Sequence, residues 1–153
     1  NRERQWRHEM DNVTGQFAVA VITQEEARIW GSEMNAETEP QVVKARNSFT
    51  RHHHIRMAQF HHMHEVDRYT DDYLKLIAVA LEPAREVLLI THGDGKASAF
   101  THLSKYFEKN YPQLAKKVSG NLDVDITRLT EPEILALARE WWDKKYGIHS
   151  TAD

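Results

Sequence analysis

An uninterrupted apolar run, Val87-Leu88-Leu89-Ile90, is the feature that most limits what this 153-residue chain can fold into. A short run with no polar residue is typical of a strand buried on both faces, as in a parallel sheet covered by helices. Beyond Gly95 the apolar residues recur at helical spacing instead, at Ala99, Phe100, Leu103, Tyr106 and Phe107. The chain is therefore expected to turn sharply between a buried strand and a helix.

The turn itself reads Gly93-Asp94-Gly95-Lys96, with the lysine beside the expected start of the helix. Free backbone N–H groups and the positive end of the helix dipole suit such a junction to an RNA phosphate or another anion, with Gly93, Gly95 and Lys96 as its residues. It departs from a nucleotide-binding P-loop, because the upstream glycine and the Ser or Thr after the lysine are missing. The alternative is that these glycines only allow a tight turn.

Charge is placed unevenly along the chain. A net charge of −3 argues against a protein that coats nucleic acid with its whole surface. Between Lys44 and Arg68, however, five Arg and Lys stand against Glu65 and Asp67, a local balance of +3, and six of the ten histidines fall there. A second basic group follows the glycine turn, at Lys105, Lys109, Lys116 and Lys117. Local patches of this kind recruit RNA where the total charge does not.

The absence of cysteine excludes disulfides, thiolate nucleophiles and cysteine-ligated zinc. No apolar run approaches the about 20 residues that span a bilayer, and the first residues, NRERQWRHEMDN, contain no hydrophobic signal core. We expect a cytoplasmic protein that binds neither membranes nor DNA. The sequence indicates no oligomeric state.

The predicted elements follow one another in the order βββαβα(β)α. They are strands at 17–23, 27–31 and 41–45, a helix at 69–81, a strand at 87–90, a helix at about 96–109, a weak strand near 116–120, and a helix that begins at the Thr130-Glu131-Pro132-Glu133 capping box. This order predicts an α/β fold with a ribonuclease H-like mixed sheet and helices on both faces. We expect one domain at 17–146, with an N-terminal extension at 1–16 and a C-terminal tail at 147–153.

A ribonuclease H-like fold raises the hypothesis of a two-metal nuclease, which needs several carboxylates converging on one point. The first expected strand, 17–23, contains no acid, and the strand 87–90 runs into Thr91-His92. We therefore predict no catalytic residue.

The segment from Arg51 to His64 has the most unusual composition in the chain, and three interpretations compete for it. In an RNA-contacting loop, arginines such as Arg51 and Arg56 pair with phosphates while His54 and Phe60 stack on bases. In a metal site, imidazoles from His52, His54, His62 and His64 hold zinc. In the third interpretation the segment is a solvated loop or a sheet edge without a selected role.

The stretch from Glu86 to Lys96, followed by an amphipathic helix, resembles the central domain of the archaeo-eukaryotic release factor and Pelota superfamily. More closely, the chain is similar to small bacterial stand-alone relatives of translational machinery type. The shared features are an opening strand pair like VAVITQEEARIW, a His-rich middle, a Gly-x-x-Lys turn, a segment like YPQLAKKVSG and a last helix like LTEPEILALAREWW, over about residues 17–142.

That resemblance implies a ribonuclease H-like domain associated with translation, with the ribosome or tRNA as partner. Only Gly93, Lys96 and the histidine segment carry over by position. Release factors hydrolyse peptidyl-tRNA with a Gly-Gly-Gln loop, whereas the one Gly-Gln here, Gly15-Gln16, follows Thr14 and precedes the first strand. Release activity is therefore not expected.

Three hypotheses for function remain open at this point. The first is a non-catalytic ribosome- or tRNA-binding domain without a cofactor, in which Lys105 adds a further RNA contact. The second is a histidine-rich metal-binding protein that holds zinc, and that could be a metal-dependent hydrolase. The third is a protein-interaction module that uses Trp141-Trp142, although core packing of one tryptophan and partial exposure of the other is the simpler expectation.

Overall fold

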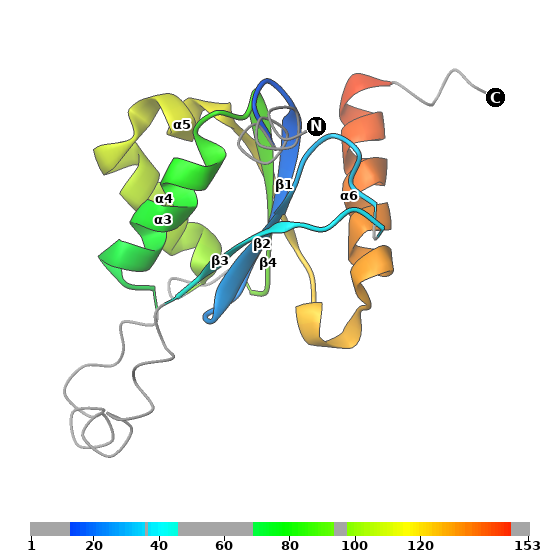
Figure 1. Ribbon diagram of the computed structural model, residues 1–153, viewed down its shortest axis with the longest axis horizontal. Helices are drawn as coiled ribbons and strands as arrows, with labels where there is room; N and C mark the ends of the chain where they lie inside the picture. Colours follow the sequence, from blue (N-terminus) through cyan, green and yellow to red (C-terminus); the bar gives the residue numbers. More distant parts are fainter. Residues whose placement is uncertain (1–12, 36, 46–68, 94–97, 148–153) are drawn as a thin grey trace, which may run out of the picture.

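The structure, a computed structural model, describes residues 13–35, 37–45, 69–93 and 98–147. They form one five-stranded sheet with helices on both faces (Figure 1). The strands are β1 (Phe17–Ile22), β2 (Glu26–Trp30), β3 (Gln41–Lys44), β4 (Glu86–Thr91) and β5 (Val118–Asp123), in the spatial order β3-β2-β1-β4-β5. The first three pair antiparallel, and β1, β4 and β5 are parallel. The predicted ribonuclease H-like mixed sheet is confirmed.

The two central strands divide their side chains between two separate cores. On β1, Ala18 and Ala20 face one core while Val19 and Val21 face the other. On β4 the same alternation places Val87 and Leu89 in the first core, and Leu88 and Ile90 in the second. All of these side chains are buried, so the prediction of a strand buried on both faces is confirmed.

The helices segregate by face, as Figure 1 shows. One face of the sheet is covered by α3 (Asp71–Leu81), α4 (Ala99–Asn110) and α5 (Pro112–Lys117), and the opposite face by α6 (Glu131–Tyr146), which follows the short 3-10 helix η2 (Ile126–Arg128). None of the helices within the described ranges is long and apolar enough to cross a membrane.

Side chains at the helix ends explain where the helices begin. The hydroxyls of Thr70 and Ser98 accept the backbone N–H of the third residue of α3 and of α4. Thr130 and Glu133 form the predicted capping box of α6, and Gly147 ends that helix in the left-handed conformation, at φ 66°.

The structure differs from the sequence prediction most clearly after α4. Residues 112–117 are helical, because Pro112 occupies the first turn, where its missing N–H costs nothing, and Leu114 is buried. The last strand therefore runs from Val118 to Asp123 rather than near 116–120. Ahead of β1, Val13 lies in the first core and the Gly15 N–H donates to the Pro83 carbonyl at 3.0 Å. These residues, assigned above to an N-terminal extension, therefore pack against the sheet and its helices.

Candidate functional site

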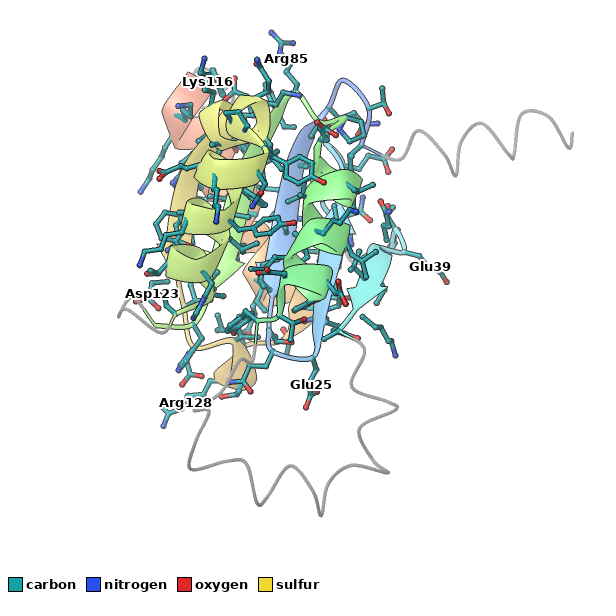
Figure 2. All side chains as sticks on the ribbon, turned by 90° about the vertical axis from the view of Figure 1, so that its left-hand side faces the viewer. Glu25, Glu39, Arg85, Lys116, Asp123 and Arg128 are labelled. Carbon is teal, nitrogen blue, oxygen red and sulfur yellow. The ribbon has the colours of Figure 1, made fainter. Side chains whose placement is uncertain are left out.

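The carboxyl ends of β1, β4 and β5 lie at one end of the sheet, because these strands are parallel. We call this the carboxyl-end edge. Glu25, Asp123 and Arg128 mark it in Figure 2, and Arg85 and Lys116 mark the opposite end. Ligands of open α/β sheets bind outside the carboxyl ends of the strands, so this edge is the first place to look for a site.

The turn that leaves β4 is held by the neighbouring strand β5. Thr91 is fully buried, and its hydroxyl donates to Asn121 Oδ1 at 2.9 Å. Gly93 has a φ of +89°, where a side chain is strained, and its N–H donates to Asp123 Oδ1 at 2.6 Å. The Gly93 N–H is thus already engaged within the protein, and this glycine contributes shape to the turn rather than a free donor.

A second group of polar contacts continues along the same edge. His92 Nδ1 lies 3.1 Å from the Val124 carbonyl oxygen and 3.7 Å from Asp125 Oδ1. The Thr127 hydroxyl donates to Asp125 at 2.6 Å, and Arg128 Nε lies 3.3 Å from its other oxygen. The hydrogen bond from Thr127 contributes most to lowering the pKa of Asp125, with His92 and Arg128 adding to it against a smaller opposing effect of burial. The negative charge of the Asp125 carboxylate is therefore already stabilised by its neighbours.

The first turn of α4 also meets this edge, since the helix follows β4 after residues 94–97. Ser98 is 8% exposed, and its hydroxyl accepts the Thr101 N–H at 3.2 Å. With 12 residues, α4 directs the positive end of its dipole toward the carboxyl-end edge. The strand and the helix predicted on either side of the glycine turn are present, and residues 94–97 between them lie outside the described residues.

The described residues that flank the segment 46–68 lie at the same edge. On its N-terminal side, the Ala45 N–H donates to the Glu25 carbonyl at 3.0 Å. On its C-terminal side, the ring of Tyr69 lies 5.2 Å from that of His102, in the first turn of α4. The Tyr73 hydroxyl, one turn further along α3, donates to the Thr23 carbonyl at 2.9 Å, and burial raises the pKa of Tyr73 above its usual range. Ala45 and Tyr69, the described residues that flank the segment 46–68, are thereby both held at the carboxyl-end edge.

Two of the predicted site residues lie within the described ranges, and the fold does not bring them together. Gly93 ends the β4 turn, whereas Lys105 is exposed on α4, seven residues beyond its cap and thus about 10 Å along the helix axis. Gly95 and Lys96, the RNA-binding candidates Arg51, His54 and Arg56, and the zinc candidates His52, His54, His62 and His64 lie outside the described residues.

Metal binding was the competing prediction. Across 13–35, 37–45, 69–93 and 98–147, no three His, Asp or Glu side chains come close enough together to hold a metal ion. The zinc set falls outside those ranges, so it stays a prediction.

Sequence reasoning missed a group of aromatic rings at the amino ends of β1 and β4. The ring of Phe17 stacks on Trp142 at 4.8 Å and on Tyr146 at 5.3 Å, and Trp141 meets Trp142 edge-on at 4.9 Å. Trp142 is buried and Trp141 partly so, as predicted for the tryptophan pair. The spacing of Trp142 and Tyr146, four residues apart on one helix face, could have indicated the group.

The comparisons with known proteins leave the family open. No protein-family model matches the chain, and no curated protein matches it. Among solved structures, Archaeoglobus fulgidus Pelota is similar, with a TM-score of 0.45 and 14% identity. The match covers 95% of this chain and 41% of the Pelota chain, so this chain spans less than half of Pelota's length. A similarity of this size carries no argument about activity, and function has to be argued from the residues of the site.

Proposed function

We propose that this protein is a cytoplasmic, translation-associated domain that binds the ribosome or tRNA without catalysing a reaction. The contacts are made at the carboxyl-end edge, by the basic histidine segment and by the turn that contains Lys96. The release-factor reaction is not part of this function, since the sequence has no Gly-Gly-Gln loop.

One observation supports the proposal: the described residues that flank the segment 46–68 and those that flank the turn 94–97 lie at one edge of the sheet. The contacts Ala45–Glu25 and Tyr69–His102 hold the described residues on either side of the segment 46–68, and Gly93 and Ser98 are the described residues on either side of the turn that contains Lys96. Cations from two separate stretches can therefore meet one phosphate backbone, which strengthens binding more than two isolated patches would.

The described side chains of this edge restrict which residues can contact phosphate. Glu25 and Asp123 are exposed acids, and Asp123 is turned to the Gly93 N–H. We therefore assign the phosphate contacts to Arg51, Arg56 and Lys96, while Gly93 and Asp123 hold the turn in place.

Co-sedimentation of the untagged protein with ribosomes, over a series of salt concentrations, tests the proposal. We expect Lys96→Ala and Arg56→Ala each to weaken binding and to reduce the salt slope by about one unit for each phosphate that the variant no longer neutralises. Lys75→Ala is the matched control, because Lys75 is exposed on the middle of α3, away from the edge. Binding that is unchanged in both variants, or equally weak in the control, would contradict the assignment.

A further inference from the structure

The opposite end of the sheet has a composition of its own. There the C-terminus of α6 meets the first residues of β1 and β4, and the rings of Phe17, Trp142 and Tyr146 lie within 10–15° of parallel. We call these three rings the amino-end cluster. Trp142 is 3% exposed and forms its base, while Tyr146 is 42% exposed and presents part of its ring to solvent. An aromatic ring held flat against two others loses little further freedom when a ligand stacks on it.

Cations surround this cluster. The Arg85 guanidinium lies 5.6 Å from the centre of the Phe17 ring, and Lys145 Nζ lies 5.6 Å from that of Tyr146 and 5.8 Å from that of Trp141. Lys144 is exposed in the same last turn of α6. Lys116, in the last turn of α5, marks this end of the molecule together with Arg85 (Figure 2).

The nearest acid is already paired inside the protein. Glu86 accepts hydrogen bonds from the Ser119 hydroxyl, at 2.6 Å, and from the Tyr146 hydroxyl. Burial alone would raise the pKa of Glu86, but these two hydrogen bonds, with Lys145 and Arg85, outweigh that effect and lower it. The Glu86 carboxylate thereby orients the Tyr146 ring, and Arg85 and Lys145 keep hydrogen-bond donors for a ligand.

Compensation of helix dipoles explains part of this arrangement. Lys116, Lys144 and Lys145 lie in last turns, where cations offset the negative end of a helix. Dipole compensation does not explain the position of Arg85, which precedes a strand rather than ending a helix. It also does not explain why the ring of Tyr146 is exposed and held in one orientation. Cations interleaved with a solvent-facing ring are the composition of surfaces that bind single-stranded nucleic acid.

We infer that the amino-end cluster binds single-stranded RNA, with a base stacked at Tyr146 and phosphates paired with Arg85, Lys144 and Lys145. This site is distinct from the carboxyl-end edge, from which it is separated by the length of β4, about 20 Å for six residues. The inference goes beyond the proposed function: the domain would contact two separate stretches of RNA with its two ends.

Fluorescence anisotropy of a short labelled oligouridylate, titrated with the full chain over a salt series, tests the inference. For the double variant Arg85→Gln/Lys145→Gln we expect about tenfold weaker binding and a salt slope reduced by about 1.4 units, since each phosphate contact to a single strand contributes about 0.7. Tyr146→Leu should weaken binding about tenfold with little change in the slope, because it removes stacking rather than charge. Tyr146→Phe loses the hydrogen bond to Glu86 but keeps a ring that stacks on Phe17, so it should keep most of the affinity.

The matched control is Lys75→Gln/Lys109→Gln, which removes the same charge from exposed positions on α3 and α4, on the other face of the sheet from α6. Thermal unfolding of every variant shows which of them fold. If Tyr146→Leu does not fold, the variants that remove exposed charges still test the inference. An affinity and slope equal to the control's would overturn the inference, as would equal affinity of Tyr146→Leu and Tyr146→Phe. The proposed function and this inference can be tested separately. If Lys96→Ala abolishes ribosome binding and the Arg85→Gln/Lys145→Gln variant retains it, only the site at the carboxyl-end edge is supported.

Discussion

The two ends of the parallel strands are held together by different kinds of interaction. At the carboxyl-end edge, exposed turns are tied by single hydrogen bonds, such as Gly93 to Asp123 and Thr127 to Asp125. At the amino end, large rings pack against one another over the start of the sheet. Truncating a packed ring leaves a cavity among its neighbours, whereas an exposed hydrogen bond is exchanged for one to water. Substitutions in these exposed turns are therefore expected to cost less stability than truncation of the packed rings at the amino end.

The largest effect that would sharpen this comparison is expected at Trp142. Trp142→Ala removes a ring that is 3% exposed, and we expect the free energy of unfolding to fall by about 3–5 kcal/mol. Its Nε1 is buried without a hydrogen-bond partner among the described residues, so Trp142→Phe removes an unsatisfied group together with part of the ring and should cost much less. Urea denaturation of both variants measures the difference, and equal losses would show that the indole N–H is satisfied.

The next effect is expected where β5 meets α6. A Cβ at Gly120 would overlap Cζ2 of Trp141 and lie 3.1 Å from its Cη2, so Gly120→Val should lower the free energy of unfolding by about 1–3 kcal/mol. Chemical denaturation is the measurement. The double variant Gly120→Val/Trp141→Leu provides the room, and it should lose less than the two single variants together. Strict additivity would mean that the two residues do not collide.

A smaller effect is expected at the carboxyl-end edge, at Gly93. Its φ of +89° strains a side chain, while a Cβ there would meet nothing within 4 Å, so Gly93→Ala should cost about 1–2 kcal/mol from backbone conformation alone. Denaturation midpoints measure this loss. A loss as large as that of Trp142→Ala would contradict the comparison, because it would show that a substitution at the edge costs as much stability as one among the packed rings of the amino end.

The smallest effect is a pH dependence at Glu86. Because the folded-state pKa of Glu86 is lowered, its contribution to stability is present above the unfolded pKa and is lost as the pH falls through the folded value. Tyr146→Phe removes one of the hydrogen bonds that lower this pKa, so the folded-state pKa of Glu86 should rise, and the acid-induced loss of stability should be smaller and complete at higher pH. Carboxyl NMR titration of the variant and the parent protein measures the shift, and Ser119→Ala should move it in the same direction.

The sequence by itself determined the type of fold, because the residue patterns that predict its strands and helices are local. The apolar run in β4 and the capping box of α6 each depend on a few neighbouring residues, and both are found where they were predicted. The helix at 112–117 was missed because it is only six residues long, too short for an apolar period to show.

Only the tertiary structure decided which residues share a site. The parallel pairing of β4 and β5 places Asp123 against the Gly93 N–H, although these two residues are far apart in the sequence. The parallel pairing of β1 and β4 brings Phe17 and Glu86 together under the last turn of α6. Strand register and crossing direction set such neighbours, and no local pattern of residues encodes them.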